Sequence, residues 1–293
     1  MLYDIRLAIT YSYAGSAMGG RHLVRVMPLD VPGQQRLIAG LLDITPRPEE
    51  RTDGVDFFGN ATTSFAFRGA HRSVGFKVQA RVERFGADPD LRHSVPLTAL
   101  PKAIVDCTDL GPASPLHFTA PSVRVPPNAA MTRYARAALR PGMSTAQAVV
   151  AIGQRIYTDM AFESKATTVE TPAAEAFAKR RGVCQDFSHI MITCLRGIGI
   201  PAGYVSGYLR TLPPPGKARL EGADAMHAWV RAWCGPTLGW LDYDPTNACI
   251  PTVDHIVAAY GRDYSDVSPI KGSLRISGGQ KSVQAVDVIP LTA

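Results

Sequence analysis

The chain has 293 residues, of which 46% are hydrophobic and 19% are charged, a composition typical of a globular protein with a full apolar core. Its net charge of +6 comes from lysines and arginines that are scattered along the chain, so we expect no nucleic-acid-binding surface. The N-terminal residues lack the apolar stretch of a signal peptide, and no run of about 18 apolar residues exists, so we expect a cytoplasmic protein without a membrane segment.

The first third of the chain has the alternating pattern of β-strands. Between residues 3 and 13 every second side chain is large and apolar, and the same period returns between residues 74 and 82. Three shorter strands are predicted at 23–27, 37–44 and 63–67. Several strands separated by turns indicate an antiparallel β-sandwich or barrel, which we place at residues 1–86.

Residues 87–130 are rich in proline and show no sustained periodicity, so we interpret them as a linker between two domains. Helices are predicted after this linker. Ser144 begins a capping-box pattern with Gln147, and apolar residues then recur at helical spacing as far as Tyr157. A second helix is predicted at 172–179, with Thr171 as its cap.

A third helix is predicted after Cys184, because apolar residues recur at three- and four-residue spacing from Phe187 to Ile198. Strands and a C-terminal hairpin follow, at 203–209, 227–233, 240–243, 273–276 and 283–289. The order of strands, helices and strands indicates an α+β fold, with helices packed on an antiparallel sheet in the second domain. We place this core, together with the hairpin, at residues 131–293.

Among the five cysteines, Cys184 is the candidate nucleophile. The cysteines form no C-x-x-C pair, so neither a zinc site nor a disulfide framework is expected. Gly182 precedes Cys184, a predicted helix follows it, and basic residues lie nearby. Free N–H groups and the helix dipole favour a thiolate at such a position, and the same N–H groups can stabilise an oxyanion. Burial under a helix is nevertheless the common fate of a free cysteine.

His227 is the candidate base, because it begins a predicted strand that would hold its ring rigidly beside the nucleophile. Two other histidines compete with it. His189 follows Cys184 on the same helix, about 140° around the axis, and so points away from it. His255 is predicted to lie in a surface helix. We therefore prefer His227.

A carboxylate is needed to orient such a base. Asp244 ends a predicted strand and is followed by Pro245, which cannot continue a central ladder. The sequence Asp-Pro-Thr-Asn is also an ordinary turn, and Asp242 is a rival on the same strand face. The order of thiol, imidazole and carboxylate, on a helix start and two strands, favours Cys184, His227 and Asp244 as one catalytic group.

Four blocks of this sequence resemble the bacterial transglutaminase-like superfamily, which has a papain-like thiol core. They are GVCQDFSH at 182–189, GIPAGYVSGY at 199–208, HAWV at 227–230 with the Gly-Trp pair at 239–240, and DPTN at 244–247. The segment YGRDYSDV at 260–267 and the β-rich first eighty residues also resemble parts that accompany this core in bacteria. The resemblance covers nearly the whole chain, and the linker is its least supported part.

The resemblance places the family's nucleophile on Cys184, its base on His227 and its orienting acid on Asp244 rather than Asp242. It implies a peptide or side-chain amide substrate, a thioester intermediate, and no metal or organic cofactor. Water as the acceptor would make the protein a protease or amidase, which we favour, and an amine acceptor would make it a transglutaminase. A catalytically silent module that holds a peptide in the same groove is the alternative from another class, and it predicts the loss of at least one of the three side chains.

Two positions depart from the family pattern. Ser188 stands where alanine is usual, and Gly203 stands where an arginine is common. The second departure removes a charge and puts a contact to a substrate carboxylate in doubt. The downstream segment carries Arg262, Asp263 and Tyr264, which either line the site or brace the C-terminal helix.

Overall fold

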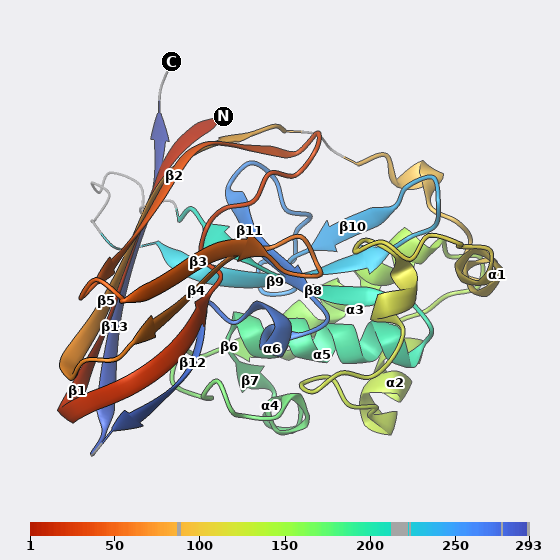
Figure 1. Ribbon diagram of the computed structural model, residues 1–293. Helices are drawn as coiled ribbons and strands as arrows, with labels where there is room; N and C mark the ends of the chain where they lie inside the picture. Colours follow the sequence, from red (N-terminus) through yellow and green to blue (C-terminus); the bar gives the residue numbers. More distant parts are fainter. Residues whose placement is uncertain (87–88, 212–221, 223, 277, 292–293) are drawn as a thin grey trace, which may run out of the picture.

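A long, curled antiparallel sheet forms one half of the molecule (Figure 1). The computed structural model describes residues 1–86, 89–211, 222, 224–276 and 278–291. The strands of this sheet are β1 (Leu2–Val24), β2 (Gln35–Thr45), β3 (Glu50–Val55), β4 (Ala61–Phe67), β5 (His71–Arg84), β12 (Ile270–Ile276) and β13 (Gln280–Leu291). Alternation explains its core, because Ile5, Leu7 and Ile9 all point to the buried face of β1.

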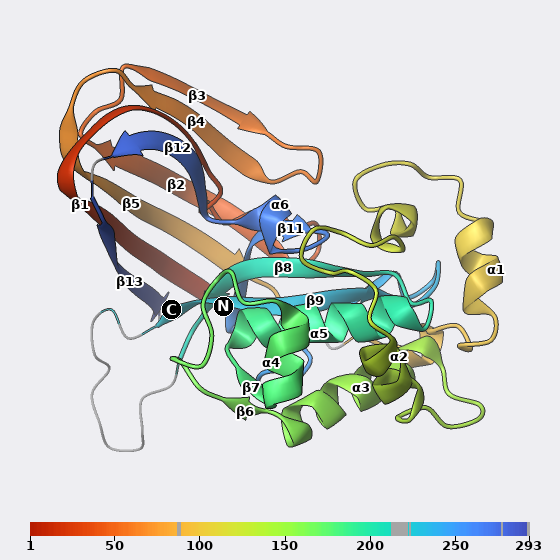
Figure 2. The same ribbon diagram turned by 90° about the horizontal axis from the view of Figure 1, so that it is seen from below.

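Strand β1 changes partners along its length. Its first half pairs with β5 on one edge and with β13 on the other, and its last residues pair with β4 and β12. The register shifts between Ser12 and Ala17 against β5, and between Met18 and Gly20 against β12. Such irregularities bend a strand, and the sheet curls over itself here (Figure 2). Of the strand that we predicted at 23–27, only the first two residues are in a strand, as the end of β1, which stops at Val24.

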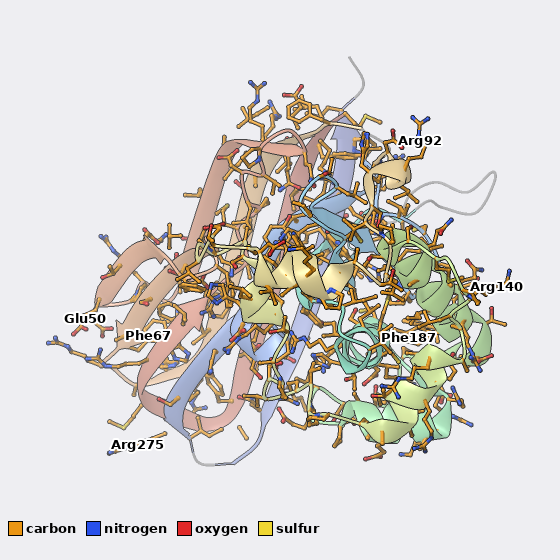
Figure 3. All side chains as sticks on the ribbon, turned by 90° about the vertical axis from the view of Figure 1, so that its right-hand side faces the viewer. Glu50, Phe67, Arg92, Arg140, Phe187 and Arg275 are labelled. Atoms are coloured by element: carbon orange, nitrogen blue, oxygen red, sulfur yellow. The ribbon has the colours of Figure 1, made fainter. Side chains whose placement is uncertain are left out.

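A four-stranded antiparallel sheet with helices on one face forms the other half (Figure 2). In spatial order its strands are β10 (Trp240–Tyr243), β9 (Ala225–Trp233), β8 (Ala202–Leu209) and β11 (His255–Gly261). The helices are α2 (Ala129–Arg136), α3 (Thr145–Asp159), α4 (Ala173–Lys179) and α5 (Cys184–Gly197). Helix α5 is the centre of this half: Phe187 and Ile190 belong to its buried core, and Figure 3 shows Phe187 among packed side chains, whereas Arg140 projects from the outside.

The predicted start of α3 is confirmed. The Ser144 hydroxyl accepts a hydrogen bond from the Gln147 N–H at 3.3 Å, and the Gln147 side chain accepts one from the Ser144 N–H at 2.9 Å. The predicted cap of α4 is wrong. Its N-cap is Pro172, and the Thr171 hydroxyl instead accepts a hydrogen bond from the N–H of Thr168.

Replacing Ser144 by alanine is expected to lower the free energy of unfolding by about 1 kcal/mol, because the first turn of α3 loses its side-chain acceptor. Urea denaturation of the two proteins measures this difference. Thr158→Ala, an exposed change in the last turn of the same helix, is the control and should stay within about 0.5 kcal/mol. Equal losses in both variants would contradict a capping role.

The described part of the segment that we predicted as a linker contains three short helical pieces before α2. They are η1 (Leu91–His93), α1 (Leu100–Val105) and η2 (Pro115–Phe118). Leu100, Phe118 and Val125 are fully buried, so the segment is fastened to the core rather than free. Pieces of three to six residues are too short to show a helical period, which is why the sequence did not predict them.

The remaining elements are short. A short parallel pair, β6 (Ala161–Phe162) and β7 (Arg181–Gly182), precedes α5, and α6 (Tyr264–Val267) follows β11. Both strands of the predicted C-terminal hairpin exist, but among the described residues they pair with β1 and not with each other, β12 with residues 17–24 and β13 with residues 2–13. The predicted hairpin is therefore wrong, and the two strands instead complete the first sheet. The division at residues 86 and 130 stays a prediction, with the two C-terminal strands now attached to the N-terminal side.

The α+β class is confirmed, and the curled first sheet is closer to the predicted barrel than to the predicted sandwich. No helix among the described residues is long and apolar enough to cross a membrane. All five cysteines are free thiols.

Candidate active site

Cys184 is the first residue of α5 and is partly exposed. The start of the helix is fixed by Asp186, whose Oδ2 accepts hydrogen bonds from the Val183 N–H at 2.8 Å and from the Thr167 hydroxyl at 2.6 Å. Glycine is required at position 182, because a Cβ there would lie 2.6 Å from Asp186 Oδ2. The local sequence therefore holds the thiol at the positive end of the helix, as predicted for a nucleophile.

His227 lies near the start of β9 and is only 8% exposed. Its Nε2 is 2.7 Å from Asp244 Oδ2. Since a carboxylate only accepts hydrogen bonds, Nε2 carries the proton and Nδ1 is left for the thiol of Cys184. Burial lowers the pKa of His227, but hydrogen bonds to Asp244 and Cys184 outweigh it and raise the pKa to about 10. The ring is therefore stable as an imidazolium at neutral pH.

Asp244 lies just after β10 and is completely buried, and its carboxylate accepts five hydrogen bonds. Oδ1 accepts from the N–H groups of Thr246 at 2.8 Å and Asn247 at 3.2 Å. Oδ2 accepts from His227 at 2.7 Å, from the Asn247 side chain at 2.7 Å and from His255 Nε2 at 3.1 Å. Burial raises the pKa of Asp244, but these donors outweigh it and hold that pKa well below its usual range.

The rival side chains have other partners. Asp242 accepts a hydrogen bond from Trp229 Nε1 at 2.9 Å, and burial raises its pKa. His189 accepts the N–H of Tyr264 at Nε2, 3.2 Å away, and burial lowers its pKa to about 4. Neither Asp242 nor His189 is hydrogen-bonded to His227. Neither side chain therefore belongs to the hydrogen-bonded group around Asp244.

Sequence reasoning missed His255. We predicted it in a surface helix, but it is the first residue of β11 and is only 4% exposed. Its ring reaches Asp244 Oδ2. The signal was present, because the β-branched pair Ile256 and Val257 directly follows it and is typical of a strand.

His227, Asp244 and His255 each offer one ligand atom, and these three atoms lie within 4.8 Å of one another. The contacts are those of a hydrogen-bond cluster, because both Nε2 atoms already donate to the carboxylate. The Asn247 side-chain N–H is directed at the same oxygen, so its positive end would oppose a cation there. We therefore assign the cluster to hydrogen bonding.

Gly203, which departs from the family pattern, has a packing reason. A Cβ at this position would lie 2.8 Å from the ring of Phe118 and 2.9 Å from the carbonyl oxygen of Gly261. The Phe118 ring, carried by η2, is fully buried against this strand. The linker thus occupies the space that a longer side chain would need.

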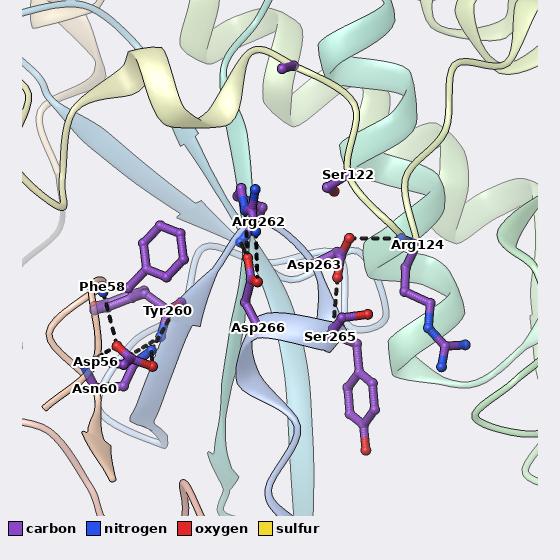
Figure 4. Close-up of polar contacts among 12 residues, drawn as sticks. Asp56, Phe58, Asn60, Ser122, Arg124, Tyr260, Arg262, Asp263, Ser265 and Asp266 are labelled. Atoms are coloured by element: carbon purple, nitrogen blue, oxygen red, sulfur yellow. Dashed lines mark hydrogen bonds and ion pairs between the residues drawn. The ribbon is translucent and has the colours of Figure 1, made fainter. Parts of the chain in front are cut away.

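The segment after β11 braces the core (Figure 4). Asp263 accepts the N–H of Arg124 at 2.8 Å and that of Ser265 at 2.7 Å, and Arg262 forms an ion pair with Asp266 at 2.8 Å. These contacts join α6 to the segment before α2. The sequence left open whether these residues line the site or have a structural role. The polar contacts of Arg262 and Asp263 indicate a structural role.

A cavity of about 380 Å³ lies beside α5, apart from the cluster around Asp244. Arg124, Glu170 and His189 line it, and Cys184 and His227 do not. Two charged side chains that line this cavity already bind each other, since Arg124 forms an ion pair with Glu170 at 2.9 Å. We therefore place the candidate active site at the cluster of Cys184, His227 and Asp244 and not at this cavity.

Comparison with known proteins gives two family matches. Residues 132–245 match the transglutaminase-like superfamily, and residues 3–83 match the bacterial transglutaminase-like N-terminal region. An uncharacterised protein of Mycobacterium tuberculosis is 34% identical over 291 residues, covering 96% of this chain and 88% of that protein. One of Mycobacterium leprae is 33% identical over 223 residues, 74% of each chain.

A solved structure has the same fold along the whole chain. It is a crystal structure from Cytophaga hutchinsonii, described as that of a candidate cysteine protease. It superposes with a TM-score of 0.79 at 23% identity and covers 100% of this chain and 91% of its own. The curled sheet and the helical half therefore occur together in another protein.

Proposed function

Because this chain belongs to the transglutaminase-like superfamily, we propose that it is a cysteine-dependent enzyme that transfers the acyl group of a peptide or side-chain amide through a thioester. Cys184 is the nucleophile, His227 the base and Asp244 the group that orients the base. The observation that supports this proposal most strongly is the buried hydrogen bond of 2.7 Å between His227 and Asp244, on the ring that also interacts with Cys184.

The first half of the reaction forms the thioester. In the resting pair the proton of Cys184 is on His227 Nδ1, and the thiolate attacks the amide carbonyl carbon to give a tetrahedral oxyanion. The N–H of Cys184, the first residue of α5, is the donor that we assign to this negative charge. Collapse of the intermediate breaks the carbon–nitrogen bond, and the imidazolium of His227 returns its proton to the leaving amine.

The second half releases the acyl group. His227 takes a proton from the acceptor, whose oxygen or nitrogen attacks the thioester carbon, and the sulfur of Cys184 leaves as a thiolate that is again paired with the imidazolium. Water as the acceptor gives a carboxylic acid, and an amine gives a new amide. We favour hydrolysis, since the solved protein of the same fold is described as a candidate cysteine protease. A reducing compartment, the cytoplasm, fits a thiol nucleophile among five free cysteines.

A peptide library that contains glutamine tests both reaction and acceptor. The protein is incubated with the library with and without a biotinylated primary amine, and mass spectrometry follows cleaved, deamidated and amine-linked products. We expect acid products in both reactions, and at least about a thousandfold less product with Cys184→Ala, because the covalent route is lost.

The matched control is Cys107→Ala, which removes another partly exposed thiol and should leave turnover unchanged. Amine-linked peptides as the main product would reassign the enzyme as a transferase. Equal turnover by wild type and Cys184→Ala would refute the nucleophile.

A further inference from the structure

Two histidines from different strands donate to one carboxylate oxygen. His227 Nε2 lies 2.7 Å and His255 Nε2 3.1 Å from Asp244 Oδ2. We propose that His255 is a positioning residue, which holds the Asp244 carboxylate in the orientation that receives the Nε2 proton of His227. This inference rests on the proposed function, because His255 would act by orienting His227, the proposed base.

The sheet topology shows what the hydrogen bond from His255 to Asp244 adds to the fold. The order of strands is β10, β9, β8 and β11, so Asp244 follows one edge strand and His255 begins the other. Within the described ranges, backbone pairing joins β10 only to β9. The hydrogen bond from His255 therefore ties the end of β10 to the far side of the sheet, across two intervening strands.

The surroundings of His255 suit a hydrogen-bond donor to Asp244 and not a residue that transfers protons. A carboxylate accepts, so the proton lies on Nε2, and Nδ1 is buried without a hydrogen-bond partner among the described residues. The titratable groups that face it are Asp244, His227 and Asp242, the last through its electrostatic contact. The edge of its ring packs on Trp229, with ring centres 5.2 Å apart at 82°. The ring is thus fixed on one side by packing and on the other by Asp244.

The chemical consequence concerns the imidazolium. When His227 accepts the proton of Cys184, its charge is stabilised only if the carboxylate faces Nε2 with the right geometry. The backbone N–H groups of Thr246 and Asn247 hold Oδ1. His255 and the Asn247 side chain share Oδ2 with His227, so rotation of the carboxylate away from His227 would break several hydrogen bonds at once.

Two variants separate positioning from packing. His255→Phe keeps an aromatic ring against Trp229 and removes the donor, whereas His255→Gln keeps an N–H donor and removes the ring. The readout is the rate at which iodoacetamide alkylates Cys184 at pH 7, followed by peptide mass spectrometry. We expect His255→Phe to slow alkylation about tenfold, the effect of one hydrogen bond to a charged group, and His255→Gln to remain within about threefold of wild type.

A purely structural role predicts the reverse order, with the phenylalanine variant closer to wild type. Thermal unfolding of each variant reports packing separately. His22→Gln, at a buried histidine of the other core, is the matched control and should leave the rate of Cys184 alkylation unchanged. Where Cys184 of the wild type reacts faster than the other cysteines, equal rates for the two His255 variants would also overturn the proposal.

A second readout does not depend on the nucleophile. In ¹⁵N-histidine-labelled protein, the low-field proton on His227 Nε2, assigned by its loss in His227→Gln, should persist in His255→Gln and broaden or vanish in His255→Phe. If Cys184 of the wild type reacts no faster than the other cysteines while this pattern holds, the proposed function fails and the positioning role stands. If Cys184 is reactive and the signal is unchanged in both variants, the positioning role fails and the proposed function stands.

Discussion

Replacing His227 by alanine is expected to slow the alkylation of Cys184 about a hundredfold at pH 6 and less than about threefold at pH 9.5, because an ordinary cysteine, with a pKa of about 8.5, is almost fully protonated at the lower pH. In the wild type the pKa of His227 is raised to about 10 by its hydrogen bonds, against the effect of burial. The imidazolium is therefore present below that pH and stabilises the thiolate. Its contribution is lost as the pH rises through about 10.

The measurement is the rate of iodoacetamide modification at each cysteine between pH 5 and pH 10, resolved by peptide mass spectrometry. His117→Ala, at an exposed histidine outside the cluster, is the control and should reproduce the wild-type profile. A His227→Ala profile that parallels the wild type across the whole range would mean that Cys184 has no imidazolium partner.

Gly207→Ala is expected to destabilise the protein by about 3 kcal/mol or more, as overpacking of a close-packed interior does. Gly207 lies on β8 opposite His227. A Cβ there would lie 2.1 Å from the carbonyl oxygen of Ile256 and 2.6 Å from the ring of Trp229. Neither neighbour can yield easily, since one is backbone and the other is a buried ring that also contacts His255.

Thermal unfolding checks this prediction, and a loss of that size corresponds to a fall of about 6–12 °C in the melting temperature. Gly279→Ala is the matched control, because no atom lies within 4 Å of the position of its added Cβ. If both substitutions change the melting temperature equally, the sheet around His227 is not as closely packed as the structure indicates.

Local pattern predicted the elements well where one face of an element is buried. The alternation from residue 3 to residue 13 belongs to β1, and the helical period after Cys184 belongs to α5, because in both cases burial selects the same side chains that the period marks. Strand β10 was predicted at its observed bounds. The order of thiol, imidazole and carboxylate also directed attention to three residues that the fold brings to one place.

Long-range pairing was not predictable in the same way. Nothing in residues 270–291 indicates that their strands pair with β1 rather than with the core sheet, because partner choice depends on the whole topology. The Phe118 ring over Gly203 is a contact of the same kind, made by a segment without periodicity. The strand at His255 was open to prediction from Ile256 and Val257, but its contact with Asp244 was not, since Asp244 follows the opposite edge of the sheet.

The pairing of β1 with both β5 and β13 has a consequence for how the chain matures. During translation, residues 2–13 are made early and residues 71–84 soon supply one neighbour, but the other neighbour is formed by residues 280–291. Until those residues leave the ribosome, one edge of β1 is open, and an open strand edge is a template for pairing with other chains. This edge of β1 is covered only after the segment that carries Cys184 and His227 has been made, so it stays open through most of the synthesis of the chain.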